Sequence, residues 1–158
     1  MDQQLRVNKV RVNEVKEFSI DKSTKWLQSI LLELLQDNGL GEDELSKSSI
    51  LLNVRIDKEH FDDYGEVVFC EGKIALSYFD ISVLTGELIT QEMDVLIKCV
   101  FLEEDNQKRH KFDDEISIFF GEEEWDLYYY KNNVTDFKSV VHEYVFLNKN
   151  PYPGKTND

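Results

Sequence analysis

The sequence predicts an α+β fold, a mainly antiparallel β-sheet with an N-terminal and a C-terminal α-helix. Runs of β-branched and aromatic residues are typical of strands, and most follow one another without a helix between them, which favours antiparallel pairing. Two other stretches have apolar residues at helical spacing. The length of 158 residues favours one domain, expected over residues 1–150, with a tail at 151–158.

The N-terminal part is expected to be a strand followed by a helix. Leu5–Val12 is rich in β-branched residues, and Phe18–Ile20 extends the strand after a polar break. Over Ser23–Asp37 the apolar residues recur at helical spacing, which predicts a helix. Gly39, in a left-handed conformation, is expected to end this helix. The apolar face of this helix is broad enough to pack on a sheet; it consists of Trp26, Leu27, Ile30, Leu31, Leu34 and Leu35.

The middle of the chain is expected to be rich in strands. A polar linker with one helical turn, 41–49, leads to strands at Ile50–Asp57, Glu66–Cys70, Lys73–Asp80 and Met93–Leu102. Residues 60–65 are turn formers, and Glu71–Gly72 predicts a bulge. Residues 103–115 form the most charged segment and predict an exposed loop.

The C-terminal third predicts two short strands, a turn and a helix. The strands are Ile116–Phe120 and Asp126–Tyr130, and the turn is 131–133. Thr135 or Asn133 is expected to cap the helix, and prolines end regular structure after it. The apolar helix face consists of Phe137, Val140, Val141, Tyr144 and either Leu147 or Val145.

Charge favours a basic partner. The net charge is −14, from 32 acidic and 18 basic residues, and an acidic surface repels phosphate backbones. A basic protein is therefore a better candidate partner than bare nucleic acid, although the charge could serve solubility alone. Cys70 and Cys99 lie in apolar runs and predict buried thiols. Without a signal core or an apolar run of about 18 residues, a cytoplasmic protein with no membrane partner is expected.

No segment carries recognisable reaction chemistry, so no catalytic, cofactor-binding or metal-binding residue and no cofactor is predicted. A metal site could in principle be formed by four neighbouring carboxylates, because carboxylates are suitable ligands for Mg²⁺. These are Glu122, Glu123, Glu124 and Asp126. Adjacent residues of an extended chain, however, point to alternating sides and do not converge. Tyr128–Tyr130 could stack on bases, but core packing is the simpler interpretation.

Two segments carry a family resemblance: Trp125 to Gly154, WDLYYYKNNVTDFKSVVHEYVFLNKNPYPG, and the stretch VVFCEGKIALSYF. In their order along the chain they resemble the C-terminal signature and the glycine-containing strand of the YceD family, which is linked to accumulation of large-subunit ribosomal RNA. The positions that match are Trp26, Gly72, Asp136, Glu143 and Pro153. Family members carry a C-x-R-C-L block where this chain has ISVLTG at 81–86, so no zinc site is carried over.

The resemblance implies a non-enzymatic factor in biogenesis of the large ribosomal subunit. Such a factor would promote rRNA accumulation by binding a basic ribosomal protein or pre-ribosomal particle, with direct RNA contact left open. The expected acidic contact surface consists of Glu103, Glu104, Asp105, Glu122, Glu123 and Glu124. Two alternatives remain, a metal-dependent RNA-processing hydrolase and a protein-interaction domain unrelated to ribosomes.

Overall fold

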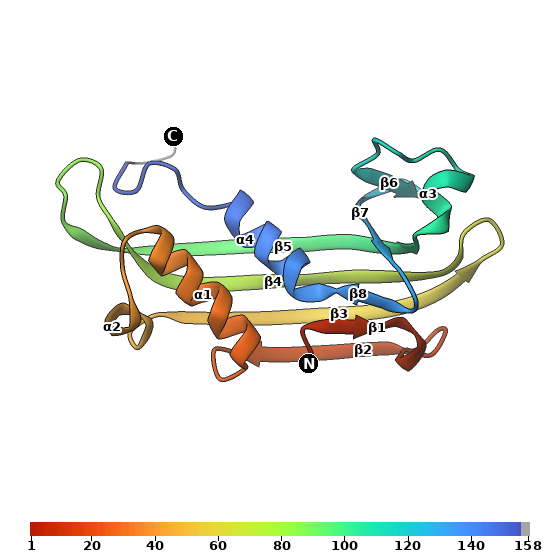
Figure 1. The fold of residues 1–158 in the computed structure, drawn as a ribbon, viewed down its shortest axis with the longest axis horizontal. Coiled ribbons are helices and arrows are strands. Elements are labelled where there is room, and N and C mark those ends of the chain that lie inside the picture. Colours follow the sequence, from red (N-terminus) through yellow and green to blue (C-terminus); the bar gives the residue numbers. More distant parts are fainter. Residues whose placement is uncertain (156–158) are drawn as a thin grey trace. The chain divides into compact units, whose positions relative to one another are not determined.

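The computed structural model describes residues 1–155 and has an α+β fold (Figure 1). A mainly antiparallel six-stranded sheet has the strand order β2-β3-β4-β5-β7-β6, and β1 pairs with β8 separately. The strands are β1 (Gln4–Arg6), β2 (Val15–Asp21), β3 (Ser49–Phe61), β4 (Gly65–Ile81), β5 (Leu88–Glu103), β6 (Ser117–Phe120), β7 (Glu123–Tyr130) and β8 (Val134–Asp136). The helices are a 3₁₀ turn at Val7–Lys9, α1 (Lys25–Asp37), α2 (Glu42–Leu45), α3 (Asp105–Arg109) and α4 (Phe137–Leu147).

Backbone contacts group the chain into two compact units. The first unit contains Met1–Phe18, Val54–Gly72 and Leu96–Phe137; the second contains Ser19–Asn53, Lys73–Val95 and the chain from Lys138 onward. The long strands β3, β4 and β5 each contribute residues to both units. The expectation of a single domain over 1–150 stays a prediction.

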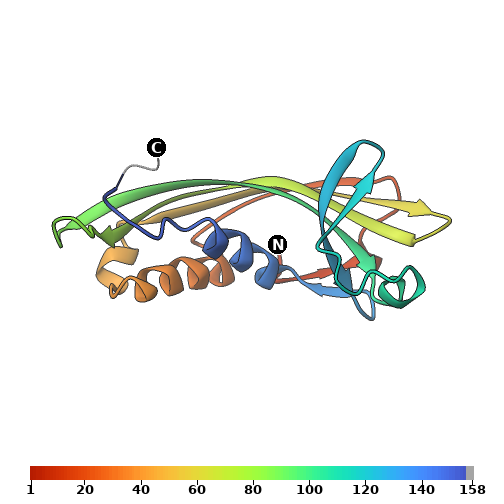
Figure 2. The same ribbon diagram turned by 90° about the horizontal axis from the view of Figure 1, so that it is seen from above.

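The second unit packs two helices on one face of its strands. Figures 1 and 2 show α1 and α4 side by side, and the predicted apolar face of α1 is buried as expected. Polar contacts join α1 to α4 and to the residues just after α4. Lys138 Nζ donates to Ser29 Oγ at 3.2 Å, His142 Nε2 lies 3.1 Å from Glu33 Oε2, and Lys149 Nζ lies 2.7 Å from Asp37 Oδ2. The helical spacing of the sequence therefore identified the α1 surface that faces the sheet.

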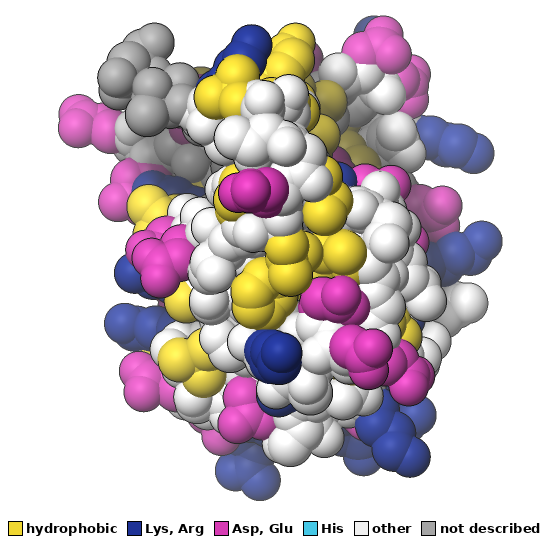
Figure 3. Space-filling model, turned by 90° about the vertical axis from the view of Figure 1, so that its left-hand side faces the viewer, with side chains coloured by type: hydrophobic (Ala, Val, Ile, Leu, Met, Phe, Trp, Pro, Cys, Tyr) yellow, Lys and Arg dark blue, Asp and Glu magenta, His cyan; other side chains and the backbone are white. Residues whose placement is uncertain are grey.

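The C-terminal tail packs on the β4–β5 turn within the second unit. The Val83 N–H donates to the Pro153 carbonyl at 2.9 Å, and Pro153 is buried. Val83 and Leu84 in this turn, and Leu88 at the start of β5, are exposed apolar side chains. Figure 3 shows hydrophobic side chains lying among charged ones on the face that it draws. The surface is thus not uniformly acidic. Of the predicted tail 151–158, residues 156–158 lie outside the described residues.

The strands of the first unit are covered on both faces. Figure 2 shows the β6–β7 hairpin on one side of these strands and the β1–β8 pair on the other. Because side chains alternate along a strand, Val68 and Cys70 are buried on the β1–β8 side while Val67 is buried with the hairpin. The hairpin-side cluster consists of Val67, Val100, Leu102, Ile118, Trp125 and Leu127, with Phe61, Tyr64, Phe69, Phe112, Phe120 and Tyr129 packed against it.

Two predictions for the strands were wrong. The main N-terminal strand is β2, while Val7–Lys9 forms a 3₁₀ turn; Val7 and Val10 are both buried, a spacing of three that an alternating strand does not give. The strands predicted at Glu66–Cys70 and Lys73–Asp80 are one continuous strand, β4. Cys70 and Ile74 are buried in the same alternating phase on either side of Glu71–Gly72.

Three further features were not predicted. The segment 103–115 is not simply an exposed loop, because it contains α3, and Asn106 is buried and donates to the Tyr64 carbonyl at 3.1 Å. Thr135 does not cap α4 but lies in β8, opposite Leu5. Finally, β5 and β7 pair parallel, because α3 and β6 lie between them along the chain and reverse its direction.

Candidate functional site

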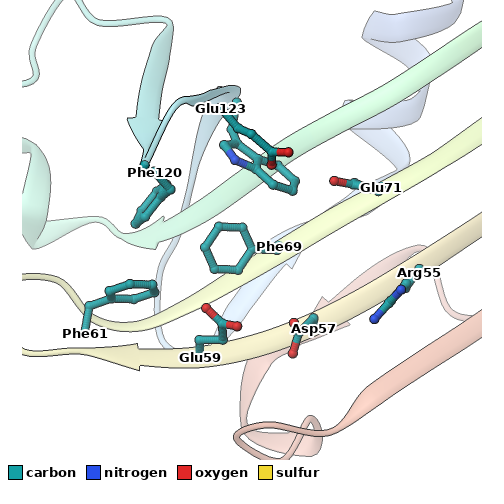
Figure 4. Close-up of a pocket in the computed structure, with 10 residues that line it drawn as sticks. Arg55, Asp57, Glu59, Phe61, Phe69, Glu71, Phe120 and Glu123 are labelled. Carbon is teal, nitrogen blue, oxygen red and sulfur yellow. The ribbon is translucent and has the colours of Figure 1, made fainter.

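A groove of about 470 Å³ lies beside the β6–β7 hairpin in the first unit (Figure 4). We call it the aromatic groove. Its floor is made by rings and its rim mostly by carboxylates. The lining residues are Arg55, Asp57, Glu59, Phe61, Phe69, Glu71, Phe120, Gly121, Glu123 and Trp125. Its volume lies within the range of ordinary ligand pockets.

Strand alternation places polar and aromatic side chains together in this groove. Asp57, Glu59 and Phe61 are alternate residues of β3 and share one face of the sheet, while Ile56 and Lys58, the residues on either side of Asp57, are buried on the other face. Figure 4 shows the side chains of Asp57 and Glu59 following one another along β3 toward the rings. A single strand therefore supplies both an acidic edge and an aromatic end.

The β6–β7 hairpin supplies the opposite wall. Its register places Phe120 opposite Glu123 and Ile118 opposite Trp125. The connection is two residues long and begins with Gly121 at φ +65°, a backbone conformation that glycine adopts readily and that suits tight hairpins. The turn thus sets which side chains of the hairpin reach the groove.

The rings of the floor are in mutual contact. Phe69 lies 5.0 Å from both Phe120 and Trp125 between ring centroids, in edge-to-face geometry, and Phe61 lies 5.1 Å from Phe120. Such arrangements are favourable beyond the burial of area. Trp125 is only 7% exposed, and its indole Nε1 has no acceptor among the residues described. The floor is a pre-formed apolar surface.

The rim is acidic. Four carboxylates, those of Asp57, Glu59, Glu71 and Glu123, line the groove together with one guanidinium, that of Arg55. An apolar floor with a negative rim favours a ligand that is apolar at its centre and cationic at its edges. The arrangement suits a segment of a basic protein better than a phosphate group.

A second hollow of the first unit, of about 380 Å³, is lined by polar residues: Glu66, Glu103, Tyr130, Asn132 and Asn133. The Tyr130 hydroxyl donates to the Glu66 carbonyl at 2.7 Å. Burial, with the negative charge of Glu103 and Glu66, raises the pKa of Tyr130 to about 12. Buried Lys58 pairs with Glu66 at 3.4 Å and donates to the Val7 carbonyl at 3.0 Å. These groups bind one another and hold this part of the unit together.

The positions that match the family lie on different elements. Trp26 is buried in the first turn of α1, and Gly72 lies within β4 with no positive φ. Asp136 ends β8 directly before α4, Glu143 is on the exposed side of α4, and Pro153 is buried in the tail. Trp26 and Pro153 therefore have packing roles, and Gly72 is not required by its backbone angles.

The predicted acidic contact surface is divided by the fold. Glu123 lines the aromatic groove, whereas Glu103 lines the second hollow. Glu104 pairs with Lys131 at 3.8 Å, and Asp105 pairs with Arg109 at 2.6 Å. Glu122 and Glu124 are exposed. Of the six predicted residues, only Glu123 places its carboxylate beside the aromatic floor of the groove.

The cysteines are unbridged buried thiols, as predicted. A hydrogen bond with the Cys70 thiol, together with burial, raises the pKa of the Cys99 thiol. Within residues 1–155, no group of three or more His, Cys, Asp and Glu side chains is placed to hold a metal ion. In the same range, no helix combines the length and the apolar character that crossing a membrane would need.

Sequence reasoning missed most of the groove. The alternation of Asp57, Glu59 and Phe61 was a usable signal, because Val54, Ile56 and Lys58 form the buried face of the same strand up to this point. The approach of Phe120 and Trp125 to Phe69 had no signal in the sequence, since it depends on the pairing of β7 with β5.

Comparison of the chain with protein-family models, with curated proteins and with solved structures gave no match.

Proposed function

We propose that the protein is a non-enzymatic factor that binds a basic protein through the aromatic groove. The observation that carries the proposal is the combination of ring contacts between Phe61, Phe69, Phe120 and Trp125 with four carboxylates on the same groove. This combination supports the binding of an apolar side chain flanked by cations.

Simple magnitudes make such binding feasible. Burial of one large apolar side chain of the partner contributes about 1.5–3 kcal/mol, and a cation over a tryptophan contributes about 0.5–2 kcal/mol. A net charge of −14 attracts a basic partner over longer distances and speeds association. In this proposal the groove determines which partner binds, and the overall charge increases the rate of association.

We further propose that the partner is a basic protein of the large ribosomal subunit, and that its capture promotes accumulation of large-subunit rRNA. This setting rests on the resemblance of Trp26, Gly72, Asp136, Glu143 and Pro153 to the YceD pattern. The acidic rim disfavours phosphate, so the partner protein, and not the groove, would contact the RNA.

The test compares two variants of equal net charge in a cross-linking pull-down from growing cells that identifies protein and RNA. The groove variant is Asp57→Asn/Glu59→Gln/Glu123→Gln. The control variant is Asp114→Asn/Glu122→Gln/Glu124→Gln, at exposed positions of the same unit. Each has a net charge of −14 + 3 = −11. We expect the groove variant to recover about tenfold less of a basic large-subunit protein, since three weak ion pairs together amount to about 1.4 kcal/mol.

Equal recovery by the two variants would mean that the groove is not the binding surface. Recovery of basic proteins unrelated to ribosomes would support the proposed binding function but contradict the proposed role in the large ribosomal subunit. Cleavage of RNA by the purified protein with Mg²⁺ would instead favour the metal-dependent hydrolase.

A further inference from the structure

Lys98 places a cation of the protein itself against two lining residues of the aromatic groove, Trp125 and Glu123. Its Nζ lies 4.9 Å from the centroid of the Trp125 ring and 3.5 Å from Glu123 Oε2. In the parallel pairing of β5 and β7, Cys99 lies opposite Asp126, so Lys98 and Trp125 each lie one residue before that pair. Alternation directs both side chains to the groove side of the sheet.

The two sides of this contact differ in mobility. Trp125 is fixed by its burial and by Phe69, whereas the Lys98 side chain is 40% exposed and Glu123 is more exposed still. Exposed ion pairs of this kind are weak. The ion pair with Glu123 therefore contributes little to holding the ammonium at this place, while the buried Trp125 ring stays fixed and can receive another cation.

An arginine fits this position better than a lysine does. A guanidinium is planar, stacks on an indole face and binds a carboxylate through two N–H groups at once, whereas an ammonium acts as a point charge. Trp125 offers the face and Glu123 the carboxylate. The neighbouring rings of Phe69 and Phe120 can then accept an apolar side chain from the same partner segment.

We propose that Trp125 and Glu123 form an arginine-binding subsite that Lys98 occupies in the free protein, so that Lys98 competes with the partner's arginine. The proposal rests on the binding function of the groove but not on the ribosomal identity of the partner. Lys98 acts as an internal competitor: it lowers affinity for weakly cationic segments and favours those that place a guanidinium on Trp125.

The test uses the intact chain and synthetic peptides of alternating leucine and arginine. The sequence contains only two tryptophans, so 5-fluorotryptophan labelling gives two ¹⁹F resonances, with Trp26 as the internal control. Trp125→Phe assigns the signals. Peptides in which lysine or neutral citrulline replaces arginine test for the guanidinium, and dissociation constants come from the same titrations.

Lys98→Met removes the competing cation and keeps an unbranched apolar side chain at this position. Lys131→Met is the matched control, since it removes the same charge from an exposed residue of the same unit that pairs with Glu104 outside the groove. We expect Lys98→Met to bind the arginine peptide about three- to tenfold more tightly, in line with the strength of one cation–π contact. Lys131→Met should change binding less than about twofold, and Lys98→Arg should not tighten it.

The arginine peptide should shift the Trp125 resonance and leave that of Trp26 unchanged, and citrulline should abolish most of the shift. The proposal is overturned if Lys98→Met and Lys131→Met behave alike, or if saturation leaves the Trp125 resonance in place. If the peptide still binds in those cases, and Asp57→Asn/Glu59→Gln/Glu123→Gln weakens it, the binding function of the groove stands without this subsite. If no arginine peptide binds, both proposals fail.

Discussion

Leu31 illustrates how single residues stabilise this protein. It is fully buried on the face of α1 that packs in the second unit. Its side chain was assigned to that face from helical spacing alone. Truncation would remove apolar burial and leave a cavity, and both effects destabilise the folded state.

Leu31→Ala is therefore expected to lower the free energy of unfolding by about 2–5 kcal/mol. Leu147→Ala, on an exposed residue of α4, serves as the control and should change stability by less than about 0.5 kcal/mol. Urea denaturation followed by circular dichroism measures both. Similar losses in the two variants would contradict the packing described for α1.

The β6–β7 hairpin is the element on which the groove depends most. It brings Phe120, Glu123 and Trp125 to one wall through a turn whose Gly121 has φ +65°. A Cβ at this position would have no atom within 4 Å, so the cost of replacing the glycine comes from backbone conformation and not from collision.

Gly121→Ala is expected to destabilise the first unit by about 1 kcal/mol, because an L-residue resists the left-handed conformation. Gly121→Asn should cost less, since asparagine tolerates that region. Thermal unfolding measures the cost, and titration with the leucine–arginine peptide should show weaker binding for alanine than for asparagine. Equal behaviour of the two variants would show that the turn conformation does not control the groove.

For the whole molecule, buried tyrosine side chains are expected to lower the stability of the folded state at alkaline pH. Burial, helped by the charge of Asp80, raises the pKa of Tyr78 from 10.0 to about 12, and burial with nearby carboxylates does the same to Tyr130. Between pH 10 and 12 the unfolded chain has lost these protons while the folded protein keeps them. The unfolded state then binds fewer protons, so stability falls as pH rises through this range.

The double variant Tyr78→Phe/Tyr130→Phe should have a shallower loss of stability between pH 10 and 12 than the unaltered protein. Its stability at pH 8 will differ for other reasons, including loss of the hydrogen bond from Tyr130 to Glu66, so the slope is the relevant quantity. Urea midpoints measured at each pH provide it. Tyr152→Phe, at an exposed tyrosine, is the control. A slope equal to that of the control would contradict the assignment of the pKa shifts.

Elements with a strong internal period were predictable from the sequence. The face of α1 and the alternation of β3 are set by local spacing, and the two buried cysteines follow from their apolar runs. The β1–β8 pair was not predictable in the same way. β1 and β8 are three residues each and are extended because they pair with one another, a contact between residues that are far apart in the chain.

The sequence by itself determined an acidic α+β protein, a mainly antiparallel sheet and the helix face that packs against its strands, because each depends on composition or on a period of two or 3.6 residues. Tertiary structure alone decided that β7 pairs parallel with β5 and that Trp125 meets Phe69 and Lys98. It also selected Glu123, out of a run of three acids, as the one that borders an aromatic floor. The physical reason is that a groove is made by side chains from separate strands, and their meeting depends on strand order and register, which local spacing does not encode.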